Sequence, residues 1–136
     1  MGLSLRHDRG ALARATLEGV AYGLRDSLEL LRELGVSPEA GRISGGGSRS
    51  SLWVSIVASV LDLPLERTGA EEGSAFGAAL LAGVRDGVFA NVEDAVSRCV
   101  RVSGRVESEE PWVPVYEEGY ARYRELYPTL RPLEGR

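Results

Sequence analysis

Three consecutive glycines, Gly45-Gly46-Gly47, separate two apolar segments of this 136-residue chain. The short segment 42–44 before them is typical of the end of a buried strand. After them, apolar side chains recur at the three- and four-residue steps of a helix face: Leu52, Trp53, Ile56, Val57, Val60 and Leu61. The sequence therefore predicts a strand, a glycine turn and a helix, in that order.

The predicted turn has a chemical interpretation and a structural one. Glycines let the backbone approach a ligand closely, and the free amides at a helix start attract anions such as phosphate. Glycine-rich turns between a strand and a helix are also common without a ligand, so the turn alone leaves a purely structural role open. Its spacing matches neither a Walker motif nor a dinucleotide fingerprint.

Further elements are predicted on both sides of this unit. Residues 11–35 are expected to form a long amphipathic helix, and residues 63–67 a second strand. Two helices are predicted over 72–85 and 91–99, followed by a loop over 100–111. A last helix is predicted over 114–127 and is ended by Pro128 and Pro132. The apolar stripe of the first helix is Leu17, Val20, Ala21, Leu24, Leu28 and Leu31, and the inward residues of the 72–85 helix are Phe76, Leu80 and Val84. Four tyrosines of the last helix are expected to pack within the domain: Tyr116, Tyr120, Tyr123 and Tyr127.

The alternation of strands and helices predicts an α/β fold with parallel strands. Two short strands make a narrow sheet for helices this apolar. We therefore expect an exposed apolar edge and face, which would favour self-association or a partner chain.

Composition excludes several classes of function. The net charge of −4 provides no basic excess for binding nucleic acid. All sixteen basic residues are arginine, so a phosphate-binding lysine of the P-loop kind is impossible. With Cys99 and His7 as the only cysteine and histidine, neither an internal disulfide nor a zinc cluster is expected, which fits the cytoplasm. No apolar run approaches the ~20 residues that a membrane span needs.

Other polar clusters have simpler explanations. The acidic pair in Glu71-Glu72-Gly73 favours a helix N-terminus, where carboxylates are stabilised by the helix dipole. The triplet His7-Asp8-Arg9 is interpreted as helix-capping and solvated groups rather than as an acid/base site. The serines after the glycines have no second histidine to activate them, which argues against a serine hydrolase.

Three ordered segments together resemble the C-terminal region of the FGGY carbohydrate kinases, and xylulokinase-like members most closely. They are residues 2–22 with Glu18-Gly19-Val20-Ala21-Tyr22, residues 43–53 with the triple glycine, and residues 72–79 with Glu72-Gly73-Ser74-Ala75-Phe76-Gly77. The resemblance implies an α/β fold that is the C-terminal part of an actin-like (ribonuclease H-like) ATPase domain, helix-rich with a short parallel sheet. Residues 1–136 would be the C-terminal nucleotide-binding half-domain, with the N-terminal sugar-binding domain absent from the chain.

The resemblance also implies a set of site residues. Gly45, Gly46, Gly47 and Ser50 correspond to nucleotide contacts, and Ser51 and Ser55 to weaker ones. The position of Ser55 is commonly glutamine in relatives, and that of Ser59 is often aspartate. ATP and Mg²⁺ are implied for the full enzyme. The catalytic aspartate of relatives precedes Gly2, so no catalytic or metal-binding residue is assigned here, and neither Asp8 nor Asp26 takes that position.

Two hypotheses follow from these observations. In the first, the chain is the nucleotide-binding portion of an ATP-dependent sugar kinase, which phosphorylates a pentulose or a related sugar or polyol in the full enzyme. ATP or ADP would be its ligand, the sugar would bind only in the full enzyme, and neither nucleic acid nor membrane would be a partner. In the second, it is a catalytically inactive oligomerisation or regulatory module derived from a sugar kinase; the serines at positions 55 and 59 favour this alternative.

Overall fold

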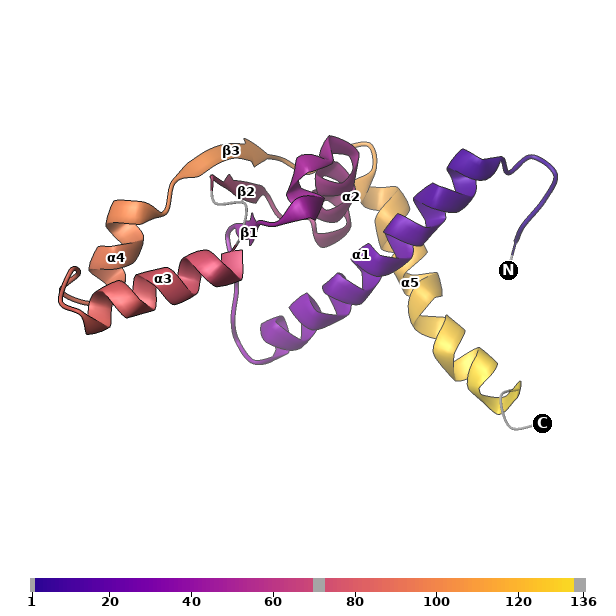
Figure 1. The fold of residues 1–136 in the computed structure, drawn as a ribbon. Helices are drawn as coiled ribbons and strands as arrows, with labels where there is room; N and C mark the ends of the chain where they lie inside the picture. Colours follow the sequence, from indigo (N-terminus) through magenta and orange to yellow (C-terminus); the bar gives the residue numbers. More distant parts are fainter. Residues whose placement is uncertain (1, 70–72, 134–136) are drawn as a thin grey trace.

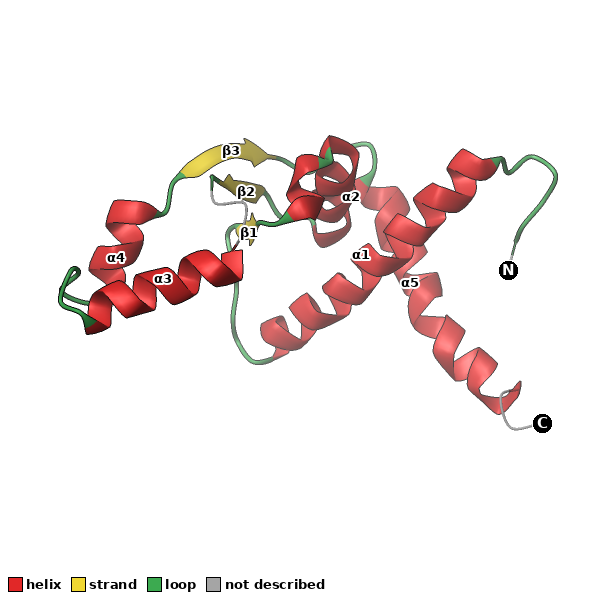
Figure 2. Cartoon of the chain, in the orientation of Figure 1, coloured by secondary structure: helices red, strands yellow, loops and turns green. Residues whose placement is uncertain are grey.

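The computed structural model describes residues 2–69 and 73–133 and arranges them as helices around a small sheet (Figures 1 and 2). The elements follow one another as α1 (Arg9–Glu33), β1 (Gly41–Ile43), the 3-10 helix η1 (Gly46–Arg49), α2 (Ser51–Leu61), β2 (Leu65–Thr68), α3 (Gly73–Arg85), α4 (Val92–Cys99), β3 (Val102–Val106), α5 (Val113–Leu130) and the 3-10 helix η2 (Arg131–Leu133). Helices α1 and α5 cross on one side of α2, and α3 and α4 form a separate pair on the other side of the molecule.

The sheet is mixed and has the strand order β1-β2-β3. Strands β1 and β2 are parallel, as predicted, with Ile43 opposite Arg67. The prediction of a loop over 100–111 is wrong, because residues 102–106 form β3, which pairs antiparallel with β2. Its composition obscured it: β3 is an edge strand with Ser103, Gly104 and Arg105 at its centre, so most of its side chains lie in solvent and show no apolar alternation.

Helix boundaries agree with the sequence patterns to within a few residues. Helix α1 begins earlier than predicted, since Asp8 is its N-cap and accepts a hydrogen bond from the Ala11 amide at 2.8 Å. This capping role confirms the interpretation of the His7-Asp8-Arg9 triplet. Helix α5 was expected to end at Pro128 but continues to Leu130, because a proline in the exposed last turn removes only one helical hydrogen bond.

The core is built on α2, whose residues are buried along most of its length. Helix α1, the sheet and α5 each contribute side chains to the same cluster, which consists of Ala21, Val54, Ile56, Val57, Ala58, Val60, Leu65 and Tyr116. Full burial of one such aliphatic side chain is worth ~1.5–3 kcal/mol relative to leaving it in water. Packing around α2 therefore holds α1, the sheet and α5 together.

The predicted apolar stripe of α1 is only partly buried. Ala21 and Leu28 face the core, but Val20, Leu24 and Leu31 are 56%, 44% and 45% exposed. Arg25, placed by the pattern on another face, is 8% exposed. Helix α2 covers a narrower strip of α1 than the pattern suggests, and the buried Arg25 finds polar partners on α1, α2 and α5.

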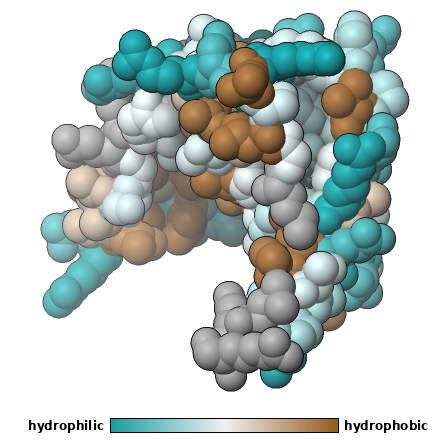
Figure 3. Space-filling view, turned by 90° about the vertical axis from the view of Figure 1, so that its right-hand side faces the viewer, coloured by the Kyte–Doolittle hydropathy of each residue, from teal (hydrophilic) through white to brown (hydrophobic). Residues whose placement is uncertain are grey.

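Apolar side chains also reach the surface elsewhere. Helix α3 has no buried residue, and Phe76, Leu80 and Val84 on its predicted inward face are half-buried through its contact with α4. Brown apolar atoms lie among polar ones on the face seen in Figure 3. No helix in the described ranges is both long and apolar enough to cross a membrane.

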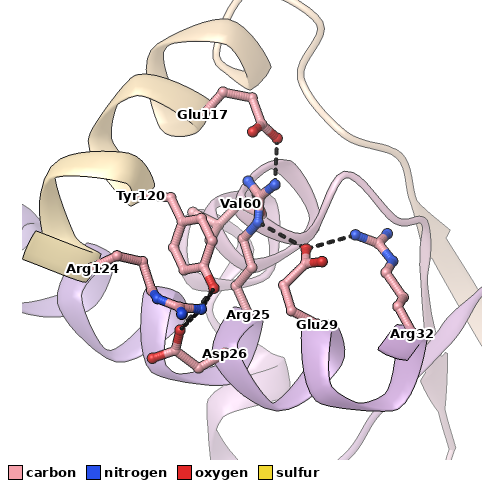
Figure 4. A network of polar contacts seen from close by, with 8 residues as sticks. All are labelled: Arg25, Asp26, Glu29, Arg32, Val60, Glu117, Tyr120 and Arg124. Carbon is pink, nitrogen blue, oxygen red and sulfur yellow. Dashed lines mark hydrogen bonds and ion pairs between the residues drawn. The ribbon is translucent and has the colours of Figure 1, made fainter. Parts of the chain in front are cut away.

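The guanidinium of Arg25 joins three helices (Figure 4). It donates to the Val60 carbonyl at the end of α2 at 3.1 Å, and it pairs with Glu117 of α5 at 2.6 Å and with Glu29 of its own helix at 3.4 Å. Its carbon lies 4.5 Å from the centre of the Tyr120 ring, within the range of a cation–π contact. One buried cation thus links α1, α2 and α5.

Tyrosines fill the crossing of α1 and α5. The ring of Tyr22 lies 6.2, 6.0 and 5.4 Å from those of Tyr116, Tyr120 and Tyr123. A side chain at Gly119 would overlap the Tyr22 hydroxyl, so glycine permits this close approach. Three of the four tyrosines of the last helix therefore pack within the domain as predicted, whereas Tyr127 is 64% exposed.

We expect Arg25→Met to lower the free energy of unfolding by about 2 kcal/mol, because it leaves the Val60 carbonyl and the Glu117 carboxylate without their charged donor. Urea denaturation followed by circular dichroism measures this change. Arg32→Met is the matched control. It removes a more exposed ion pair of 2.8 Å with the same Glu29, and should cost less than about 1 kcal/mol. Equal losses in the two variants would contradict a structural role for Arg25.

A second prediction concerns alkaline pH. Burial raises the pKa of Tyr22 from its ordinary 10 to about 12, and the nearby Glu18 carboxylate contributes to the shift. Because the folded state favours the neutral phenol, this contribution to stability is complete below pH 10 and is lost as pH rises from 10 through 12. Urea midpoints measured across this range should fall less steeply for Tyr22→Phe than for the unsubstituted chain. Parallel curves would show that Tyr22 does not contribute.

Candidate functional site

The triple glycine forms a compact turn between the end of β1 and the start of α2. Gly45 has φ 77° and ψ −173°, a conformation essentially restricted to glycine, and η1 follows directly. The Gly45 carbonyl accepts hydrogen bonds from the Ser48 amide at 3.1 Å and from the Ser48 hydroxyl at 2.7 Å. The Gly47 carbonyl accepts one from the Ser50 amide at 3.2 Å. We call residues 45–50 the glycine loop.

Ser50 connects the glycine loop to α2. It is the N-cap of the helix, and its hydroxyl accepts a hydrogen bond from the Trp53 amide at 3.3 Å. Beyond Ser50, Ser51 is exposed on the first turn of α2, and Ser55 lies one turn later on the same side of the helix. The six predicted residues lie along the glycine loop and the first two turns of α2, and each is exposed or half-buried: Gly45, Gly46, Gly47, Ser50, Ser51 and Ser55.

The three glycines differ in their surroundings. A side chain at Gly45 or Gly46 would meet no other atom within 4 Å, so this part of the loop is open. A Cβ at Gly47 would lie 3.2 Å from Nε1 and 3.3 Å from Cδ1 of Trp53. Amides that begin a helix lack intrahelical acceptors and carry the positive end of its dipole. The open part of the loop can thus accept an anion or the oxygen atoms of a polar ligand.

Ser59 lies in the core rather than at the glycine loop. It is 1% exposed, donates to the Ser55 carbonyl at 2.7 Å and accepts from the Glu109 amide at 2.9 Å. Its hydroxyl therefore ties α2 to the segment that precedes α5. The sequence pattern gave no sign of this partner, because Glu109 lies 50 positions further along the chain.

The start of α3 approaches the same end of the sheet. A Cβ at Gly73 would lie 3.1 Å from the Ser44 hydroxyl, so two of the sequence segments singled out above meet directly before the glycine loop. This contact was not predicted. The signal in the sequence that could have indicated it is Gly73, a small residue at the start of the predicted helix. The acidic pair Glu71 and Glu72 lies outside the described residues.

Residues 44–55, which include the glycine loop and the start of α2, contain no histidine and no carboxylate. Asp8 caps α1, and Asp26 accepts a 2.7 Å hydrogen bond from Tyr120 in the network of Figure 4, so both carboxylates have structural partners. Within the described part of the chain, no group of three histidine, cysteine or carboxylate side chains is arranged to hold a metal ion.

Comparison with known proteins identifies the family. Residues 1–85 match the C-terminal domain of the FGGY family of carbohydrate kinases. The chain belongs to this family. Xylulose kinase of Escherichia coli K12 is 33% identical in an alignment of 139 positions that covers 97% of this chain and 27% of the relative. Xylulose kinase of Staphylococcus epidermidis RP62A is 31% identical over 133 residues, 98% of this chain and 27% of the relative. This chain, called the FGGY domain below, thus spans about a quarter of the length of these relatives.

Solved structures place the same fold in several kinases. Xylulose kinase from Rhodospirillum rubrum superposes with a TM-score of 0.85 and 37% identity over 100% of this chain and 28% of that one. Glycerol kinase from Plasmodium falciparum, solved with ADP, gives 0.74 over 92% of this chain and 26% of that one at 20% identity, a likeness that shows the fold alone. The FGGY domain is therefore the C-terminal part of an actin-like ATPase fold, helix-rich with a small mixed sheet, as the resemblance implied apart from the antiparallel β3.

Gly45→Ala should strain the glycine loop, because an alanine in this conformation costs ~1–3 kcal/mol. We expect a corresponding decrease in the free energy of unfolding, measured by urea denaturation. Gly46→Ala is the control, since Gly46 has neither a positive φ nor a neighbour within 4 Å and should change stability by less than about 1 kcal/mol. A larger loss at Gly46 than at Gly45 would contradict the observed loop geometry.

Proposed function

We propose that this FGGY domain binds the nucleotide of an ATP-dependent sugar kinase. The observation that carries the proposal is the glycine loop, which opens Gly45 and Gly46 to solvent at the N-terminal end of α2. In the proposed complex, the loop amides and the hydroxyls of Ser50, Ser51 and Ser55 contact ATP or ADP. Such a surface holds nucleotide through backbone donors and needs no lysine.

The proposed reaction belongs to a longer protein. Residues 1–136 would be the C-terminal nucleotide-binding half-domain, and the sugar-binding domain with its catalytic base would lie in the remaining part. The full enzyme would transfer the γ-phosphoryl group of ATP to a hydroxyl of a pentulose or a related sugar or polyol. Similarity to xylulose kinases supports this substrate class. Phosphoryl transfer depends on positioning and charge stabilisation, and this chain would supply the nucleotide side alone.

Magnesium is implied by the family for the full enzyme, where it would be held largely by the nucleotide phosphates. The part in catalysis that we propose for this chain is to hold and orient the nucleotide. On its own we expect it to be inactive, because the sugar-binding domain and the catalytic base would lie in the remaining part of the longer protein. A cytoplasmic setting, where ATP is available, fits this role.

The exposed apolar side chains of α1 and the unpaired side of β1 support a further part of the proposal. Within the described residues, strand β1 pairs with β2 alone, and Val20, Leu24 and Leu31 are 44–56% exposed. A partner chain or a second copy that covers these features would bury apolar surface and complete the sheet. The alternative function, an inactive oligomerisation module, would require the same association.

Isothermal titration calorimetry with ADP tests the nucleotide site directly. We expect saturable binding, weakened about fivefold by Ser50→Ala, which corresponds to one lost hydrogen bond. Asn91→Ala is the matched control. It removes an equivalent N-cap, the 2.8 Å hydrogen bond to the Asp94 amide, from α4 and should leave ADP affinity unchanged. Absence of binding at millimolar ADP would refute the nucleotide site and leave the inactive module as the favoured function.

A further inference from the structure

Trp53 occupies an unusual place between the core and the glycine loop. It lies on the first turn of α2, is half-buried and packs against the core cluster. The edge of its five-membered ring faces Gly47, at the 3.2 and 3.3 Å separations from a Cβ position given above. Such separations are tighter than ordinary van der Waals contact, so any residue larger than glycine at position 47 would press against the indole.

Two hydrogen bonds link Gly47, Ser50 and Trp53 in addition to this close approach. The Ser50 amide donates to the Gly47 carbonyl at 3.2 Å, and the Trp53 amide donates to the Ser50 hydroxyl at 3.3 Å. The edge of the indole lies beside Gly47, so close that a Cβ there would press against it. Gly47, Ser50 and Trp53 therefore hold one another, and only Trp53 of the three is also packed into the hydrophobic core.

The three glycines have separate roles in this arrangement. Gly45 supplies the positive φ that turns the chain, and Gly46 leaves the loop open. Gly47 makes room for the indole. Glycine has more conformational freedom to lose on ordering than any other residue, so a loop of three glycines is poorly ordered unless something holds it. Ordering it before the ligand arrives removes that cost from binding.

We infer that Trp53 is a positioning residue for nucleotide binding, which holds Gly47 so that the loop amides are presented to the ligand in one arrangement. Trp53 acts through the loop and need not contact the nucleotide. The inference rests on the proposed nucleotide site. It adds to that site a residue whose side chain packs against the rigid core and restrains the glycine loop.

A double-mutant cycle on the intact chain, with ADP as the probe, tests this inference. Trp53→Leu and Gly47→Ala should each weaken ADP binding about tenfold in calorimetry, the first by releasing the loop and the second by a steric clash. In the double variant the smaller leucine makes room for the added methyl group. The combined loss should therefore be well below the product of the two single losses. A residue with a merely structural role would give multiplicative effects.

Two further variants separate positioning from loss of packing. Leu52→Ala alters the neighbouring residue, which is 47% exposed, and should leave ADP affinity unchanged. Trp53→Phe keeps an aromatic ring in the core but lacks the edge that meets Gly47, so we expect a folded protein with an intermediate loss of affinity. Circular dichroism verifies folding of each variant.

The outcomes distinguish the inference from the function on which it rests. If the unsubstituted chain fails to bind ADP, both are overturned. If it binds ADP and folded Trp53→Phe and Trp53→Leu bind equally well, only the positioning role is overturned. Multiplicative losses in the Gly47/Trp53 pair would likewise overturn it while leaving the nucleotide site in place.

Discussion

Burial of α2 is the constraint on which the rest of the structure depends. This helix contributes the largest fully buried side chains, Ile56, Val54 and Val60, and it is surrounded by α1, α5 and the sheet. The glycine loop is continuous with its N-terminal end. Because the core fixes α2 in place, it also fixes the point at which the glycine loop joins the helix. Hydrophobic packing of α2, rather than polar contacts within the site, therefore sets the position of the site.

The polar contacts add direction to this packing. Apolar surfaces alone would let α1 and α5 slide over α2, because burial is non-directional. Arg25 removes that freedom, since its guanidinium has a fixed planar arrangement of donors and reaches a carbonyl, two carboxylates and an aromatic ring at once. The buried hydroxyl of Ser59 acts similarly between α2 and the segment before α5.

Much of this arrangement was predictable from local sequence patterns, and the exceptions have identifiable causes. Helical periodicity and the glycine turn gave the order of the elements around β1 and α2, and three segments read together gave the family. The strand at residues 102–106 was missed because an edge strand needs few apolar residues. The burial of Arg25 and the contact between Gly47 and Trp53 depend on three-dimensional neighbours, which periodicity within one helix does not reveal. The assignment of the loop to a nucleotide stays a prediction.

The contact between α1 and α5 has a consequence for how the chain acquires its structure. Arg14 donates to the hydroxyl of Tyr116 at 2.8 Å across 102 positions of sequence, and Tyr116 completes the cluster that contains Ala21. Contacts this distant must wait for the intervening chain and slow folding, because the loop between them has to close first. During synthesis, α1 and α2 would leave the ribosome with one side of their shared core uncovered. The apolar interior would close when the helix of tyrosines arrives, so the interval before that is when the nascent chain is most prone to aggregation.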